Sequence, residues 1–350
     1  MIPTRLDELT PAWLADALGL PVVAVDAAFV GTGQMGDSVR LKLTYDGTGV
    51  EGPASLVAKL PATDEKSRGT AAALRNYETE TSFYRELAPE LPVRAPRCWY
   101  VDHDPVSDAF VLLLEDLAPA EQGDQLAGCS VDQAAIAVDE LPRLHAPRWG
   151  DPKLADIPWL NRGGDDSAAF TAQLIGSLYP GFRERYAERL DPDVLEMGDG
   201  FAPRLLPYFT GRTGPRTVAH GDYRLDNLLF GTEAGGYPVA VIDWQTVTWG
   251  DGISDLSYFL GAGLVPEDRR AAEDELVRSY HGAMVAAGVD GLTWDDCWDR
   301  YRYYAFAGFL MAVAASMLVV QTERGDDMFV TMAQRHGRHV LDLEAERLLP

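Results

Sequence analysis

The hydrophobic periodicity of this 350-residue chain changes near residue 115, and this change limits its possible folds more than any other feature. Before that point, apolar residues alternate with polar ones or form short β-branched runs, which is typical of strands. After it, the three-to-four-residue spacing of helices dominates. The sequence therefore predicts an α+β protein with two lobes, as its length also suggests: a β-rich lobe over 1–117 and a larger, mostly helical lobe over 118–350.

Short strands are predicted in the first lobe, and turn signals at 46–49 and 104–108 favour mostly antiparallel pairing. The predicted strands cover 22–30, 39–45, 55–60, 98–102 and 109–114. One helix over 70–87 interrupts them. In the second lobe a capping box at Ser130 to Gln133 begins one helix, and others begin near 167, 267, 294 and 326. Short strands are predicted there only within 217–243.

The charge of the chain excludes several kinds of partner. Its 30 Lys and Arg oppose 54 Asp and Glu, giving a net charge of −24. Such a surface repels nucleic acids and anionic membranes and attracts cationic small molecules. The oligomeric state is left open.

Other features predict a soluble cytoplasmic protein. The three cysteines are far apart, so neither a disulfide framework nor a thiolate zinc cluster is expected. Acidic residues near the N-terminus interrupt any apolar core of an export signal. The charge-free run 303–320 just reaches the length of a membrane span, but its composition favours a helix buried in the helical lobe.

A glycine-rich segment, GTGQMG, carries Gly31, Gly33 and Gly36. In a dinucleotide-binding fold a helix would begin at the last glycine. An alternating, strand-like run follows instead, and a glycine loop between antiparallel strands is the arrangement that covers nucleotide phosphates in kinases. An ordinary hairpin turn is the alternative interpretation.

Lys59 lies within a predicted apolar strand, where a buried ammonium needs an anionic partner. In kinases such a lysine holds nucleotide phosphates and pairs with a helix glutamate. Glu80, on the apolar side of the following helix, is the best-placed partner, and Glu78 is the second choice. The alternative is an edge lysine whose charged end reaches solvent.

The strongest motif is HGDYRLDN at 220–227, which is followed by VIDWQ at 241–245. Asp222 and Asn227 have the spacing of a kinase catalytic loop, in which the aspartate reaches the acceptor hydroxyl and the asparagine reaches the metal. Asp243, at the end of an apolar strand, is the expected second metal ligand. These oxygen ligands suit Mg²⁺. Two turns capped by Asp and Asn are the alternative.

Together these motifs make the chain similar to the aminoglycoside phosphotransferase and choline kinase-like superfamily of small-molecule kinases, which has the protein-kinase-like fold. LLLEDL at 112–117, LHAPRW at 144–149 and GDGISDLSYFL at 250–260 support the resemblance. It covers nearly the whole chain and looks most like the ecdysteroid kinase-like branch. Pro142 departs from the pattern and predicts a kink.

The resemblance implies specific roles. Asp222 orients and deprotonates the acceptor hydroxyl, and Asn227 with Asp243 holds Mg²⁺. Glycines 31, 33 and 36, with Lys59 and Glu80, position the phosphates of ATP, and the linker from Glu115 to Leu117 receives the adenine. His220 is expected to be a hydrogen-bonding brace, His145 a core histidine and Asp255 a tie to the next helix. Asp226 either approaches the acceptor or is a solvated loop carboxylate.

The predicted function is ATP- and Mg²⁺-dependent phosphorylation of a small-molecule hydroxyl. Aminoglycoside-, macrolide-, choline- and steroid-like acceptors all remain possible: aromatic residues favour a bulky apolar alcohol, and the acidic charge favours an amine. The alternative is a non-catalytic nucleotide-binding protein on the same fold.

Overall fold

The computed structural model describes residues 2–30, 35–47, 49–161, 165–211, 214–232 and 237–349. Its first unit extends to Ala120 and also contains Ala240–Thr246 and a short segment beginning at Gly231. The second unit contains the rest of the chain. The first unit thus ends three residues beyond the predicted boundary, and it also holds the segment that carries Asp243.

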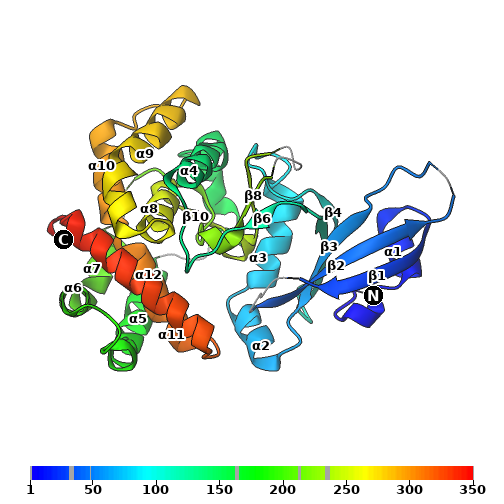
Figure 1. The fold of residues 1–350 in the computed structure, drawn as a ribbon, viewed down its shortest axis with the longest axis horizontal. Coiled ribbons are helices and arrows are strands. Elements are labelled where there is room, and N and C mark those ends of the chain that lie inside the picture. The colour runs from blue at the N-terminus through cyan, green and yellow to red at the C-terminus, as the bar shows by residue number, and fades with distance from the viewer. Residues whose placement is uncertain are drawn as a thin grey trace. The chain divides into compact units, whose positions relative to one another are not determined.

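The first unit is built on a five-stranded antiparallel sheet (Figure 1). Its spatial order is β1-β2-β3-β5-β4. All five predicted strands are present: β1 (Val22–Phe29), β2 (Gly36–Tyr45), β3 (Ser55–Pro61), β4 (Cys98–Asp104) and β5 (Ala109–Glu115). Alternation in the sequence therefore identified this sheet correctly.

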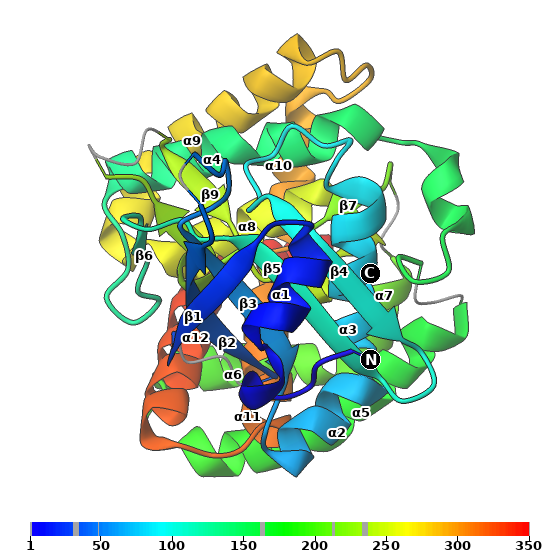
Figure 2. The ribbon, with the colours of Figure 1, turned by 90° about the vertical axis from the view of Figure 1, so that its right-hand side faces the viewer.

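One face of the sheet is covered by helix α1 (Pro11–Leu18), as Figure 2 shows. The Thr10 side chain caps this helix by accepting a hydrogen bond from the Trp13 amide. Leu14 is fully buried against a cluster of alternate residues from β2 and β3 that includes Leu41 and Leu56. The period-two pattern of these strands thus places one apolar side of each against α1.

The prediction of one continuous helix over 70–87 is wrong. The structure has α2 (Glu65–Ala73), α3 (Asn76–Ser82) and a π-helical turn, Phe83–Leu87. Arg75, at φ 55°, takes the left-handed conformation and separates α2 from α3. The predicted apolar face is nevertheless buried from Tyr77 to Leu87, whereas Ala73 is exposed.

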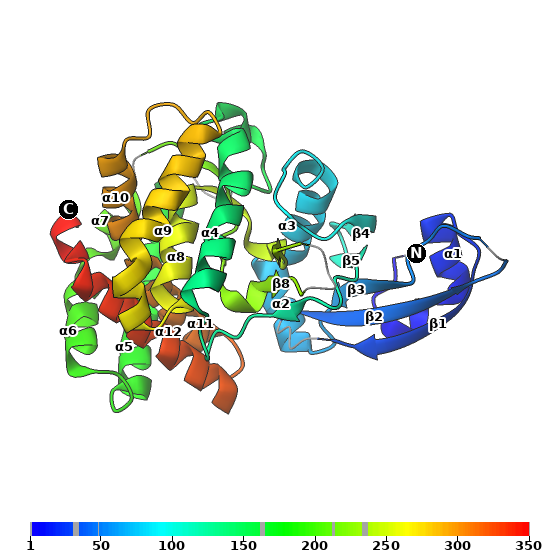
Figure 3. The ribbon, with the colours of Figure 1, turned by 45° about the horizontal axis from the view of Figure 1, so that its top comes forward.

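The second unit is mainly helical, and α4, α8 and α9 pack side by side in it (Figure 3). Ser130 and Gln133 form the predicted capping box of α4, which continues through Pro142 to His145. The helices are α4 (Val131–His145), α5 (Asp165–Tyr186), α6 (Pro192–Phe201), α7 (Leu205–Thr210), α8 (Gly252–Gly263), α9 (Pro266–Ala286), α10 (Trp294–Tyr303), α11 (Phe306–Leu318) and α12 (Glu323–Asp342).

The charge-free run 303–320 is not one helix. It begins with the last residue of α10, and α11 starts at Phe306. Much of α11 is buried, in agreement with the expected core position. Among the described residues, no helix combines the length and apolar character needed to cross a membrane.

Five short strands and several 3₁₀ turns also occur in the described structure. β7 (Thr217–Ala219), β8 (Leu228–Phe230) and β9 (Val239–Val241) occur where the sequence predicts them. β6 (Glu121–Gln122) pairs with β8, and β10 (Thr248–Gly250) pairs with β7. The loop 220–227 therefore lies between β7 and β8 at the end of two antiparallel ladders.

Close packing of His336 against glycine leads to a stability prediction. A Cβ atom at Gly308 would lie 1.8 Å from Nε2 of the buried His336 ring. Gly308→Ala should therefore lower the free energy of unfolding by about 3 kcal/mol, as overpacking does. Gly282→Ala on α9 is the control, because a Cβ there meets nothing within 4 Å. Removing a helical glycine should raise stability by about 0.5–1 kcal/mol.

Urea unfolding of both variants measures the difference. Equal unfolding midpoints for Gly308→Ala and the wild type would contradict this packing.

Candidate active site

In the first unit, Lys59 on β3 and Glu80 on α3 form an ion pair. The Lys59 Nζ atom lies 2.6 Å from Glu80 Oε1 and 3.0 Å from Asp243 Oδ1. The Lys59 side chain is only 16 % exposed. Burial alone would lower its pKa, but the charges of Asp243 and Glu80 outweigh this effect and raise the pKa of Lys59. Lys59 therefore remains a cation.

The expected pairing with Glu80 is thus present, and the second choice, Glu78, binds Arg75 instead, with an N–O distance of 2.6 Å. Tyr77, the residue before Glu78, lies on the inner face of the same helix, and its hydroxyl donates to the Met35 carbonyl. The helical spacing seen in the sequence correctly separates the inward glutamate from the outward one.

Asp243 follows β9 in a left-handed conformation, at φ 64°. Aspartate tolerates this region better than most residues. The next residue fixes the turn: the Trp244 ring stacks on Phe83 with centroids 3.9 Å apart, and its backbone N–H donates to Glu80 Oε1. The Gln245 amide donates to Asp243 Oδ2 at 3.2 Å. The carboxylate is therefore held in place by both of its oxygens.

In the second unit, the loop 220–227 is anchored from α8. Asp255 accepts hydrogen bonds from the backbone N–H groups of His220, at 2.6 Å, and Gly221, at 3.0 Å. Gly221 has φ 80°, a conformation that disfavours any other residue, which explains a glycine at this point of the motif. The expected tie between Asp255 and the loop is confirmed.

Two histidines support this anchor. His145 is fully buried, as expected, and its Nε2 lies 3.2 Å from Asp255 while its Nδ1 bonds the Tyr280 hydroxyl. His220 is also buried, and its Nδ1 accepts from the Asp222 backbone N–H at 3.2 Å. His220 therefore acts as the predicted brace.

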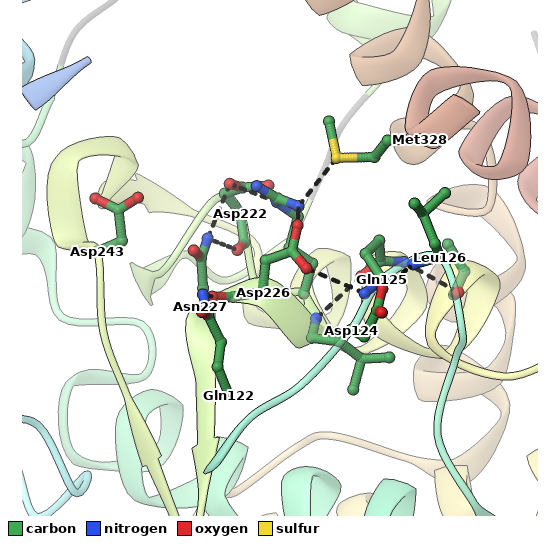
Figure 4. Close-up of polar contacts among 12 residues, drawn as sticks. Gln122, Asp124, Gln125, Leu126, Asp222, Asp226, Asn227, Asp243 and Met328 are labelled. Carbon is green, nitrogen blue, oxygen red and sulfur yellow. Dashed lines mark hydrogen bonds and ion pairs between the residues drawn. The ribbon is translucent and has the colours of Figure 1, made fainter. Parts of the chain in front are cut away.

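Asp222 and Asn227 are joined directly (Figure 4). The Asn227 Nδ2 atom donates to the Asp222 side-chain Oδ2 and to its backbone carbonyl, both at 2.9 Å. This double contact fixes which end of the amide is nitrogen and turns the Asn227 oxygen away from Asp222. The spacing of four residues thus produces a closed loop in which the Asp222 carboxylate and the amide of the buried Asn227 are joined, with the amide oxygen turned away from Asp222.

Asp226 is fixed within the loop rather than solvated freely. Its Oδ1 accepts from the Gln125 backbone N–H at 3.0 Å (Figure 4). Its other oxygen pairs with Arg224. The Arg224 guanidinium also contacts the Met328 sulfur on α12, at 3.5 Å. Arg224 thus links the loop 220–227 to α12.

The predicted nucleotide-binding positions are only partly described. Gly31 and Gly33 lie outside the described residues. Gly36 begins β2 opposite Pro61, so a strand and not a helix follows the glycine segment. This excludes the dinucleotide-binding interpretation.

The predicted adenine linker is held by its own unit. The Glu115 carboxylate accepts two hydrogen bonds from Arg94, and its backbone N–H donates to the Arg97 carbonyl at 2.8 Å. Leu117 is buried, and its carbonyl accepts from Ala120. A role of these residues in binding adenine remains a prediction.

The donor set of the expected metal ligands fits Mg²⁺. Asn227 offers an amide oxygen and Asp243 a carboxylate, each fixed by hydrogen bonds within its own unit. Both are hard oxygen ligands, and Mg²⁺ completes its coordination with phosphates and water. The described part of the chain contains no cluster of three His, Cys, Asp or Glu residues that could hold a metal by itself.

Sequence reasoning missed several contacts of these residues. Tyr258 on α8 donates to Asp222 at 2.8 Å, and Phe83 supports Trp244. In each of these two contacts the partners are far apart in sequence, so no local spacing signals the contact. Tyr258 and Trp244 do, however, lie inside the quoted motifs GDGISDLSYFL and VIDWQ.

Comparison with known proteins gives a family match. The model of the phosphotransferase enzyme family matches residues 39–304. Among curated proteins, acyl-CoA dehydrogenase family member 10 of Mus musculus is 41% identical over 61 residues. That match spans 17% of this chain and 6% of the mouse protein.

Solved structures with low sequence identity have the same fold. APH(2″)-IIIa, in its GDP and kanamycin complex, has a TM-score of 0.54 at 15% identity, covering 98% of this chain and 99% of its own. Choline kinase of Cryptosporidium parvum Iowa II has a TM-score of 0.53 at 11% sequence identity, and the match covers 97% of this chain and 93% of the choline kinase. Ethanolamine kinase of Plasmodium vivax has a TM-score of 0.52 at 10% sequence identity, and the match covers 89% of this chain and 82% of the ethanolamine kinase. These structures confirm the predicted fold class, and the family match over residues 39–304 confirms the predicted superfamily. The ecdysteroid kinase-like branch remains a prediction.

Proposed function

The chain belongs to the phosphotransferase enzyme family, and on this premise we propose that it transfers the γ-phosphoryl group of ATP to a hydroxyl of a small molecule. The observation that carries the proposal is the joined pair Asp222 and Asn227 on a loop anchored by Asp255. A fixed carboxylate next to an amide oxygen that is turned away from it is what a proton acceptor beside a metal ligand requires. The proposal places the enzyme in the cytoplasm, where ATP is available.

Each residue has a defined task in this proposal. Asp222 accepts the proton of the acceptor hydroxyl, whose oxygen attacks the γ-phosphorus. Lys59, held by Glu80, neutralises charge on the phosphates. Asn227 and Asp243 would hold Mg²⁺, which supplies further positive charge against the phosphate oxygens. Positioning and charge neutralisation account for such a reaction without a covalent enzyme intermediate.

The acceptor remains a class of compounds. The complex of APH(2″)-IIIa contains kanamycin, a choline kinase has a similar fold, and the net charge of −24 attracts cations. We therefore propose hydroxylated amines as the first group to test, with macrolide- and steroid-like alcohols as the second.

ADP release in the presence of hydroxylated metabolites and antibiotics tests this function. Acceptor-stimulated release that needs Mg²⁺ supports the transferase. ADP release that no acceptor stimulates indicates hydrolysis. Nucleotide binding without any ADP release would support the non-catalytic alternative.

Nucleotide binding itself has an expected signature in hydrogen exchange. Adding ATP with Mg²⁺ should slow exchange of the amides of residues 31–39, around Lys59 and at 115–117, because these segments are expected to contact the nucleotide. NAD should protect none of them, because β2 begins at Gly36 where a dinucleotide fold needs a helix. Exchange measured by mass spectrometry compares the two ligands. Protection of these segments by NAD, or no protection by ATP, would contradict the assignment.

A further inference from the structure

The Asp222 carboxylate is surrounded by donors from separate parts of the second unit. Tyr258 Oη on α8 donates to Oδ1 at 2.8 Å. Arg224 Nε donates to Oδ2 at 3.1 Å, and Asn227 Nδ2 donates to the same oxygen at 2.9 Å. The two oxygens of this carboxylate are therefore not equivalent.

Counting acceptor positions separates their roles. A carboxylate oxygen accepts about two hydrogen bonds. Oδ2 receives both Arg224 and Asn227, so its positions are filled. Within the described residues, Oδ1 receives Tyr258 alone. Oδ1 thus retains one position for an incoming hydroxyl.

We propose that Tyr258 is a positioning residue that holds Asp222 so that Oδ1 receives the proton of the acceptor hydroxyl. The inference rests on the proposed function and assigns the reacting atom within it. The acceptor O–H bond breaks and its proton moves to Oδ1. The acceptor oxygen forms the new bond to the γ-phosphorus, and the bond from that phosphorus to the bridging oxygen breaks and releases ADP.

The Tyr258 hydroxyl is suited to this task because it stays protonated. Its side chain is buried, and burial, followed by the charge of Asp222, raises the pKa of Tyr258 well above its usual value. A phenol that keeps its proton at physiological pH donates a hydrogen bond to Oδ1 and does not compete for the acceptor's proton. The nearby charged groups are Arg224 and Asp226.

The Tyr258 ring also has a rigid support. It stacks on His336 of α12, with ring centroids 5.4 Å apart and planes at 21°. His336 fills a slot between two glycines: a Cβ at Gly308 would lie 1.8 Å and one at Gly261 2.4 Å from its ring atoms. Burial, followed by Arg269 and Arg335, lowers the pKa of His336 to about 3, so this ring is neutral. Three helices thus fix the position of one hydroxyl.

Tyr258→Phe tests the inference because it removes the hydroxyl and keeps the stacked ring. We expect kcat for acceptor phosphorylation to fall about 10- to 100-fold, with the KM for ATP nearly unchanged, because the hydrogen bond is made to a reacting group and not to the nucleotide. The matched control is Tyr186→Phe. Tyr186 is also buried and donates to a carboxylate, Asp326, at 2.6 Å, but outside the proposed site. The kcat of the Tyr186→Phe variant should equal that of the wild type.

A double-mutant cycle separates positioning from a structural effect. In the Asp222→Asn background, Tyr258→Phe should cause little further loss, because the oriented proton acceptor is already absent. An additive loss in the double variant, or wild-type kcat for Tyr258→Phe alone, would overturn the inference while leaving the proposed function intact. A wild-type enzyme that phosphorylates no acceptor would overturn both.

Discussion

Asp222→Asn should reduce kcat for phosphoryl transfer by about 10³-fold or more while leaving ATP affinity nearly unchanged. The substitution preserves the size of the side chain but removes the proton acceptor and its negative charge, and general-base catalysis typically contributes about 10²- to 10⁴-fold. An asparagine also cannot accept from Tyr258, Arg224 and Asn227 together, because it has one acceptor oxygen in place of two. Steady-state kinetics and calorimetric titration with ATP measure the two effects separately.

Asp326→Asn is the matched control, since Asp326 also accepts from a buried tyrosine, Tyr186. This variant should retain wild-type kcat. Turnover of Asp222→Asn at the wild-type rate would remove Asp222 from the mechanism, whereas equal losses in both variants would indicate a general effect on folding.

Asp243→Asn should lower ATP affinity in the presence of Mg²⁺ and reduce kcat by about 10²-fold or more, with little change in ATP affinity in EDTA. The reason is that a neutral amide is a weaker ligand than a carboxylate for a hard divalent cation. Asparagine is preferred to alanine here because Asp243 has φ 64°, a conformation that asparagine tolerates and alanine disfavours. Titrations with and without Mg²⁺ give the comparison.

An equal fall in affinity under both conditions would show that Asp243 acts through its ion pair with Lys59 and not through a metal. Gln245→Glu provides a further check, because it keeps a side chain of the same size beside Asp243 Oδ2 but replaces the amide donor. The added negative charge repels the Asp243 carboxylate, and the hydrogen bond that holds it is lost. ATP affinity in the presence of Mg²⁺ should therefore fall, although the carboxylate itself is kept.

The regular parts of the fold were predictable because their patterns are local. The alternation Val39, Leu41, Leu43 identifies β2, and the Ser130 capping box identifies α4. The break at Arg75 could not be read from local spacing, since a left-handed arginine gives no signal in the helical pattern. β6 and β10 lack the short apolar runs that predicted β7, β8 and β9: β6 consists of the exposed polar residues Glu121 and Gln122, and β10 reads Thr-Trp-Gly.

The candidate site was predictable where its residues belong to a local motif and not where they arrive through helix packing. The motif around Asp222 and the strand lysine Lys59 carry fixed chemical requirements, so their identity follows from residue type and spacing. The hydroxyl of Tyr258 and the ring of His336 reach the site through helix packing, which connects residues 36 and 114 positions away from Asp222. Single-sequence patterns do not record such contacts, and for the same reason the acceptor was not identified.

The fate of an isotopically labelled γ-phosphoryl group tests the central claim most directly. The wild-type enzyme is incubated with Mg²⁺, ATP labelled with ¹⁸O in the γ-phosphoryl group, and the hydroxylated amines and alcohols, and products are analysed by mass spectrometry. The proposed function predicts a labelled phosphate ester of one acceptor class, formed by the wild type and by Tyr186→Phe but not by Asp222→Asn. Label recovered only in inorganic phosphate, or remaining entirely in ATP, would contradict it.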